Sequence, residues 1–255
     1  MNELYTNVSA EYVSLGGGLR GYFARPVHGG VQPGIVLFQE AFGLNPYVES
    51  EVRRLAASGY AAIAPDIFRG KQFSYADMAP VMANMQTLTD EGLLADAKAC
   101  LDFFDGRDDI KHEGYGAIGF CMGGRLAFLA AAEFGSRIAA AVAFYGGGIA
   151  PAPESPRTPQ LHRIPGISAS LLMIYGADDH AIDATEHGRL AAALSAAKKE
   201  YAISVYPDAG HGFASRDRDS YRPDVADVAW RSALRFFFDK LDHERSAPRA
   251  AEKIA

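Results

Sequence analysis

The amino-acid sequence predicts an α/β fold: a single, mostly parallel, twisted sheet of about eight strands with helices on both faces. Three observations lead to this prediction. From residue 34 onward, short apolar runs of strand type alternate with runs of helical periodicity. The short runs are almost continuously apolar, as in parallel strands that are buried on both faces. The chain has 255 residues, which is enough for one such domain with a substantial core.

The strand-like runs are rich in β-branched and aromatic residues and are bounded by glycine, proline or polar residues. They cover residues 11–15, 20–26, 34–40, 60–66, 115–120, 139–146, 170–176 and 202–207. No helical pattern separates the first two runs. We therefore expect these two to form an antiparallel hairpin at one edge of the sheet.

Helical patterns follow most of the later strands. They cover residues 46–59, 90–104, 123–135, 184–199 and 222–241. The last pattern has a broad apolar stripe that includes Trp230, so this helix should dock on the sheet and close the domain. The proline-rich stretch 151–166 is read as a loop, because strands and helices alternate again directly after it. We predict one domain, residues 1–243, followed by a flexible tail, residues 244–255.

Composition narrows the possible partners and locations. The chain carries 25 basic and 31 acidic residues and has no basic block, which argues against nucleic acid as a partner. Its apolar runs are far shorter than the roughly 20 residues that cross a bilayer, and its start lacks the features of a signal peptide, so we expect a cytoplasmic protein without a membrane span. The two cysteines cannot form a zinc site alone. Cys100, on a helical pattern, is expected to be a buried apolar residue.

Cys121 stands in a different setting, in the turn GFCMGGR between a strand pattern and a helix pattern. Glycines on both sides suit a strained turn that needs small neighbours, and the start of a helix favours a thiolate. In an open parallel sheet, functional residues gather where the strands end. After two later strands come the pair Asp178 and Asp179, and then His211. Nucleophile, acid and histidine in this order match the chain order of an α/β-hydrolase triad.

With these residues in place, the sequence resembles the dienelactone hydrolase family of α/β-hydrolases, whose members use a Cys-Asp-His triad. The matching pieces follow in the family's order from Phe38 to Ala214: FQEAFGLN, APDIF, GFCMGGR, AFYGGG, GADDHAI and YPDAGHGFA. The resemblance implies that Cys121 is the nucleophile and His211 the general base. It selects Asp179 as the residue that orients the histidine, because the family places its aspartate three residues after the glycine that ends the strand.

The same resemblance assigns further residues of the site. It places Glu40 beside the thiol, where a carboxylate controls the protonation of the nucleophile. The backbone N–H groups of Ala41 and Met122 would form the oxyanion hole. It implies an acyl-thioester intermediate and neither a metal nor a cofactor.

The substrate pocket departs from the family pattern. Family members hold a substrate carboxylate with two arginines, one of them four residues after the histidine, where this chain has Ser215. Arg216 is the nearest replacement, and Phe42, Tyr145 and Phe213 are candidate walls. The apolar stretch MAPVMANM at residues 78–85 suggests a wider or more hydrophobic pocket. We therefore expect broad hydrolysis of small activated esters or lactones, with the anionic dienelactone a poor substrate, by a monomer or homodimer.

Two other functions remain open at the level of sequence. A class I glutamine amidotransferase also carries a cysteine in such a turn, but its histidine and glutamate lie two residues apart, and the chain has no such pair at His211. An inactive hydrolase fold could serve as a binding or thiol-sensing module. The intact set of Glu40, Cys121, Asp179 and His211 argues against that second function. Taken singly, Cys121 could be a core sulfur and Asp179 a helix cap.

Overall fold

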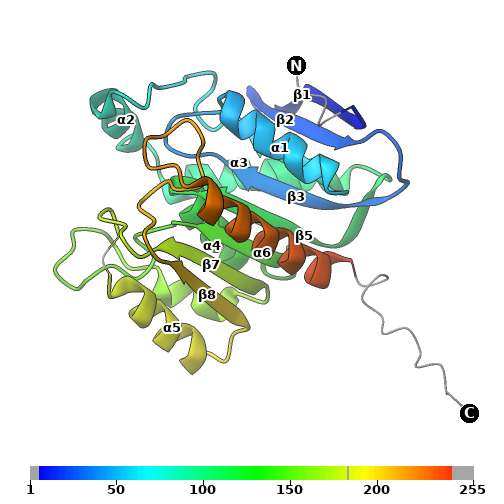
Figure 1. Cartoon of the computed structure of the whole chain (residues 1–255). Coiled ribbons are helices and arrows are strands. Elements are labelled where there is room, and N and C mark those ends of the chain that lie inside the picture. The colour runs from blue at the N-terminus through cyan, green and yellow to red at the C-terminus, as the bar shows by residue number, and fades with distance from the viewer. Residues whose placement is uncertain (1–5, 183, 243–255) are drawn as a thin grey trace, which may run out of the picture.

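The computed structural model describes residues 6–182 and 184–242, and the predicted tail from 244 onward lies outside them. The described chain forms one eight-stranded sheet in the order β1-β2-β4-β3-β5-β6-β7-β8 (Figure 1). The strands are β1 Val8–Gly16, β2 Leu19–Pro26, β3 Gln32–Phe38, β4 Ala61–Pro65, β5 Ile110–Phe120, β6 Ile138–Phe144, β7 Ser170–Gly176 and β8 Tyr201–Tyr206. The sheet confirms the predicted α/β fold.

The hairpin predicted at one edge is confirmed. β1 pairs with β2 in antiparallel register, and β2 in turn pairs antiparallel with β4. All the remaining pairs, from β4 through β3 to β8, are parallel. Their carboxyl ends therefore meet along one edge of the sheet, which is where an open α/β sheet places its ligands.

Helices cover both faces of the sheet (Figure 1). They are α1 Pro46–Ala57, α2 Met78–Met85, α3 Asp90–Asp105, α4 Met122–Glu133, α5 Glu186–Ala196 and α6 Pro223–Leu241, with short 3₁₀ turns at Gly135–Arg137 and Leu161–Gly166. α1 packs on β2 and β4, and α6 packs on β5, β6 and β7. α3 and α4 pack on the opposite face. No helix in the described part of the chain is long and apolar enough to span a membrane.

α2 was not expected as a helix. Asp77 caps it, because its side chain accepts a hydrogen bond from the Ala79 N–H at 3.1 Å. Within the helix only Val81 is buried, while Met78 and Met82 are about half exposed. The helix thus stands on the surface and contacts the rest of the molecule through a narrow face.

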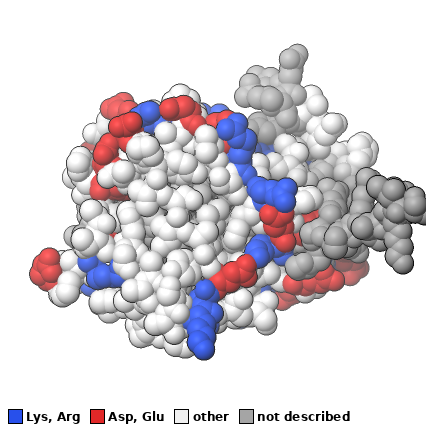
Figure 2. Space-filling view, turned by 60° about the horizontal axis from the view of Figure 1, so that its bottom comes forward, with Lys and Arg blue, Asp and Glu red and all other residues white. Residues whose placement is uncertain are grey.

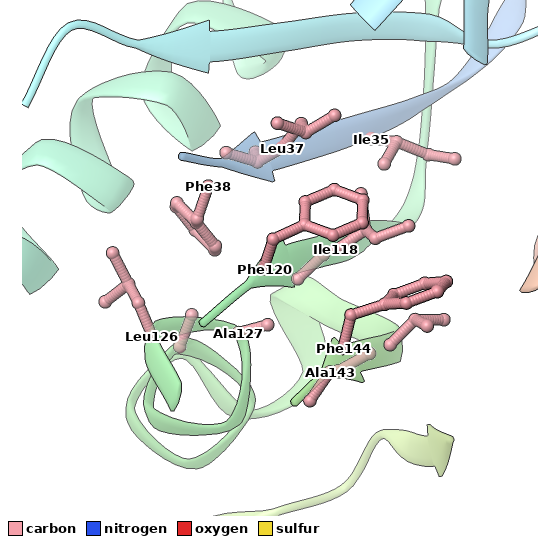
Figure 3. Close-up of a cluster of buried hydrophobic side chains, with 14 of the residues drawn as sticks. Ile35, Leu37, Phe38, Ile118, Phe120, Leu126, Ala127, Ala143 and Phe144 are labelled. Carbon is pink, nitrogen blue, oxygen red and sulfur yellow. The ribbon is translucent and has the colours of Figure 1, made fainter. Parts of the chain in front are cut away.

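The core lies on both sides of the central strands. Phe120 and Phe144, at the ends of β5 and β6, are neighbours with ring centroids 4.8 Å apart (Figure 3). Trp230 of α6 packs against both rings, with each centroid distance 5.7 Å, and is completely buried. This contact confirms the predicted docking of the last helix. Cys100 is also fully buried, as expected.

Charge is spread over the surface. On the face seen in Figure 2, Lys and Arg alternate with Asp and Glu around a broad uncharged area, and no basic patch forms there.

Candidate active site

Cys121 occupies a strained turn between β5 and α4. Its φ and ψ of 55° and −116° are unfavourable for a residue with a side chain. The Cys121 N–H donates to the Phe144 carbonyl at 3.0 Å, which ties the turn to the neighbouring strand. The turn holds the thiol partly exposed at the carboxyl edge of the sheet.

The glycines around Cys121 are needed for close backbone packing. A Cβ at Gly119 would lie 2.0 Å from the Gly123 carbonyl oxygen. A Cβ at Gly123 would lie 2.2 Å from the Phe38 carbonyl oxygen, in β3. At Gly124 it would lie 2.5 Å from the carbonyl oxygen at the end of β6. The prediction that small residues must surround this turn is confirmed.

Ala41 and Met122, the two residues predicted for the oxyanion hole, follow the ends of neighbouring strands. Met122 is the first residue of α4, so its N–H has no acceptor within the helix. Ala41 follows the end of β3 and is buried against Phe42 and Val81. The chain therefore brings both residues predicted for the oxyanion hole to the strand ends that flank Cys121, because β3 and β5 are neighbours in the sheet.

Asp179, and not Asp178, contacts His211. Asp179 Oδ2 lies 2.8 Å from His211 Nδ1, and its Oδ1 accepts a hydrogen bond from the Ala181 N–H at 2.8 Å. The Asp179 side chain is only 2% exposed, whereas Asp178 is exposed. Burial by itself would lower the pKa of His211, but hydrogen bonds to Asp179 and Cys121 raise it to about 10. The three predicted residues thus form one connected group.

Glu40 is buried at the centre of a polar cluster. Tyr145 and Tyr75 donate their hydroxyls to its two carboxylate oxygens, each at 3.4 Å. Arg218 Nη1 lies 3.4 Å from Glu40 Oε1. Burial raises the pKa of the Glu40 carboxyl, while the charges of Arg218 and His211 act in the opposite direction. The Glu40 side chain therefore needs these neighbours in order to be ionised in its buried position.

Tyr75 connects Glu40 to the surroundings. Its ring packs on Phe42, with centroids 4.2 Å apart, and its hydroxyl accepts a hydrogen bond from Asn45 Nδ2 at 3.1 Å. Burial, followed by the charge of Glu40, raises the pKa of Tyr75 to about 12, so its hydroxyl remains a donor at neutral pH. Sequence reasoning missed this residue, because it lies in a polar stretch that belongs to no regular element.

Arg218 is the second residue that sequence reasoning missed. Its guanidinium lies 5.3 Å from the centre of the Phe42 ring and directly over Gly212, where a Cβ would come within 2.3 Å of Arg218 Nη1. Gly212 has a φ of 80°, so glycine suits this position for its backbone as well as for the space it leaves.

Arg216 contacts α1. We predicted it to contact substrate, but Arg216 Nη2 donates to Glu51 Oε1 at 2.8 Å and to Ser50 Oγ at 2.9 Å, both on α1. The Arg218 N–H donates to the Ser215 carbonyl at 3.1 Å, and this turn sends residues 216 and 218 to different sides of the loop. Of these two arginines, Arg218 is the one that contacts Glu40.

The predicted pocket walls divide into two kinds. Tyr145 and Phe42 contact residues of the site, since the Tyr145 ring lies 5.2 Å from the His211 ring. Phe213 is fully buried and packs behind Tyr145 at 5.4 Å, so it supports the wall from inside the core. The apolar stretch 78–85 contributes Val81 to the packing of Ala41 and Phe42, but its methionines at 78 and 82 face solvent.

The model of the dienelactone hydrolase family matches residues 19–241 of this chain. The chain belongs to the dienelactone hydrolase family. The match covers every strand from β2 to β8 and all the residues described above for the candidate site. This protein is therefore a hydrolase of the dienelactone hydrolase type.

Several known proteins are similar over most of their length. One is a putative carboxymethylenebutenolidase of Escherichia coli K12, which is 32% identical over 88% of this chain and 83% of that one. Another is the solved structure of a putative dienelactone hydrolase of Klebsiella pneumoniae. The Klebsiella structure is 31% identical, covers 90% of this chain and 98% of its own, and has a TM-score of 0.82. A dienelactone hydrolase-like promiscuous phosphotriesterase from metagenomic libraries is 26% identical with a TM-score of 0.77, over 92% of this chain and 99% of that one.

Proposed function

We propose that this dienelactone hydrolase family member cleaves lactones or small activated esters with Cys121 as nucleophile, through an acyl-thioester intermediate. The observation that carries the proposal is the connected group of Cys121, His211 and Asp179. Because His211 Nδ1 is held by Asp179 at 2.8 Å, the other ring nitrogen is left for the thiol. This is the geometry that an activated nucleophile requires.

In the first half of the reaction, the thiol proton is held by His211, whose pKa is raised to about 10, and the sulfur attacks the carbonyl carbon. The oxyanion is stabilised by the N–H groups of Ala41 and Met122. When the tetrahedral intermediate collapses, the C–O bond breaks and the leaving oxygen takes the proton from His211. Asp179 stabilises the imidazolium between these two transfers.

In the second half, water attacks the thioester. His211 takes a proton from the water, and a second tetrahedral intermediate forms in the same oxyanion hole. Its collapse breaks the C–S bond, releases the carboxylic acid and returns the proton to Cys121. The net reaction adds one water to one ester or lactone, and no other reactant is needed.

Glu40 is proposed to control the charge of the site. Its carboxylate is buried and interacts with the charge of His211, so an ionised Glu40 favours the imidazolium form of His211. Arg218 and the two tyrosine hydroxyls support this effect, because they stabilise the negative charge on Glu40 itself. A substrate that disturbs the cluster would change the protonation of the nucleophile.

We further propose that small activated esters and lactones without a negative charge are preferred. The guanidinium of Arg218 is already engaged by Glu40, and its partner in the family's two-arginine clamp is absent from residues 71–92. A bidentate site for a substrate carboxylate would need a guanidinium that is available for both oxygens. The amidotransferase alternative is not favoured, because the acid that contacts His211 comes from the strand before it.

The decisive experiment uses iodoacetamide and two substrates. Alkylation should abolish hydrolysis of p-nitrophenyl acetate and of a dienelactone, with the label on Cys121 and not on the buried Cys100. Cys121→Ala should be inactive on both substrates. Full activity of this variant would overturn the assignment. A specificity constant much higher for the dienelactone, and lost in Arg218→Ala, would leave the nucleophile intact and overturn the proposed substrate preference.

A further inference from the structure

The segment that carries His211 has little structure of its own. Residues 207–222 join β8 to α6 without a helix or strand. Their backbone is held by turns, such as the bond from the Ser215 N–H to the Gly212 carbonyl at 2.9 Å. Turns fix the shape of a loop but not its place on the molecule. The position of His211 must therefore be set by contacts with other elements.

One set of such contacts comes from α1. The Tyr47 hydroxyl donates to the Ala214 carbonyl at 3.1 Å, and both groups are buried. Arg216 Nη2 donates to Glu51 Oε1 at 2.8 Å and to Ser50 Oγ at 2.9 Å. We name these five residues the α1 clasp. In Figure 1 the segment before α6, in orange, passes beside α1.

The clasp contains a buried carboxylate. Glu51 is 2% exposed, and burial raises the pKa of its carboxyl while Arg54 and Arg216 oppose the rise. Arg54 approaches the other oxygen of Glu51 only to 3.5 Å, so Arg216 supplies the shorter contact. A buried carboxylate is strongly destabilised when it loses its cation. Glu51 therefore holds Arg216, and with it the loop, in one position.

The α1 clasp contacts the part of the loop that lies between His211 and Arg218. Ala214 lies three residues after His211, and Arg216 lies two residues before Arg218. On the other side of the loop, His211 contacts Asp179 and Arg218 contacts Glu40. A shift of the loop would move both of these contacts together.

We propose that Arg216 and Tyr47 are positioning residues, which hold the loop on α1 so that His211 faces Cys121. This inference rests on the proposed function and deepens it, since it gives Arg216 a role behind the site in place of contact with substrate. Displacement of a reacting group by about 1 Å can cost roughly 100-fold in rate. The clasp is thus a structural requirement for proton transfer between Cys121 and His211.

The test compares Arg216→Ala with the wild-type protein in two measurements. The first is kcat and KM for p-nitrophenyl acetate, where we expect kcat to fall by about 10- to 100-fold and KM to change little. The second is the rate of Cys121 alkylation by iodoacetamide across pH, which reports on the thiol and imidazole without turnover. Here we expect slower alkylation at neutral pH, because the histidine no longer activates the thiol.

Three further variants sharpen the comparison. Arg235→Ala removes an arginine of α6 that is exposed and pairs with Asp239, and it should keep wild-type values in both measurements. Arg216→Lys retains a cation for Glu51 and should recover part of the lost rate. Tyr47→Phe removes only the hydroxyl that reaches Ala214, and it decides the question if Arg216→Ala does not fold.

Several results would overturn the proposal. One is a lower melting temperature with unchanged kcat and an unchanged alkylation profile, since that is what a purely structural ion pair would give. Another is a higher KM for a dienelactone with unchanged kcat, which would return Arg216 to substrate binding. Failure of the proposed function would look different, because alkylation of Cys121 would then leave hydrolysis intact in the wild-type protein.

Discussion

Asp178 and Asp179 are adjacent in the sequence, but their environments differ completely. Asp179 is buried with one oxygen on His211 and the other on a backbone N–H, whereas Asp178 is exposed. Asp179→Asn should therefore lower kcat by about 10⁴-fold, because the amide cannot stabilise an imidazolium and can reverse the tautomer of the histidine. Asp178→Asn serves as the matched control and should stay near the wild-type kcat. Steady-state kinetics would show the reverse ranking if Asp178 orients His211.

The residues at this site also mark where prediction from sequence stops. Cys121, the pair Asp178 and Asp179, and His211 could be found because each comes shortly after a strand pattern, and the sheet brings such positions together. The resemblance to the family then selected Asp179 from the pair. Tyr75 and Arg218 lie in stretches without periodicity, and their places depend on turns whose direction no pattern encodes. The loop bend between Arg216 and Arg218 illustrates this, since two residues of the same type end on different sides.

At the level of elements, the turn between β5 and α4 depends on backbone contact with β3. Gly123→Ala would place a Cβ 2.2 Å from the Phe38 carbonyl oxygen and 2.6 Å from that of Gln39, neither of which can move without shifting β3. We expect a loss of about 1–3 kcal/mol in the free energy of unfolding, measured by urea denaturation. Activity should fall as well, because the same shift moves Ala41.

Gly188 of α5 provides the control for this substitution. A Cβ there would meet no atom within 4 Å, and the residue lies inside a helix. Gly188→Ala should therefore raise the free energy of unfolding by about 0.5–1 kcal/mol, in line with the helix preference of alanine. Equal effects of the two substitutions would show that the contacts with β3 carry no special cost.

Most elements could be predicted because their apolar patterns match their burial. The buried strands β3, β6 and β7 are continuous apolar runs, and α6 has its apolar stripe on Trp230. α2 was missed as a helix and overestimated as a pocket wall for the same reason. Its residues are apolar, yet only Val81 is buried, so apolar character there does not indicate which face is covered.

On the scale of the whole molecule, the hydrogen bonds that His211 makes in the folded protein should make stability depend on pH. The pKa of His211 rises from 6.5 to about 10 on folding, so the folded protein holds this proton more tightly than the unfolded chain. The stabilisation from this group is complete below about pH 6.5 and is lost as the pH rises toward 10. The raised pKa of Glu40 acts with the same sign, starting from lower pH.

Urea denaturation across this range gives the measurement. We expect the midpoint to fall between about pH 6.5 and pH 9.5, and to fall less in His211→Asn, which removes the titrating group. A wild-type midpoint that does not change over this range would contradict the stabilisation of the imidazolium in the folded protein. An equal fall in both proteins would assign the effect to other groups.

Glu40, Cys121, Tyr145, Asp179 and His211 follow the ends of the five adjacent strands β3, β5, β6, β7 and β8 in turn, whereas Tyr75 comes from the excursion between β4 and α3. Part of the surroundings of the site is thus encoded apart from the segments that carry the reacting residues. Mutations in the excursion can change which molecules are accepted while the sheet keeps the nucleophile in place. Directed evolution confined to residues 70–88 would therefore alter substrate range at little risk to folding, and natural divergence of this hydrolase can take the same route.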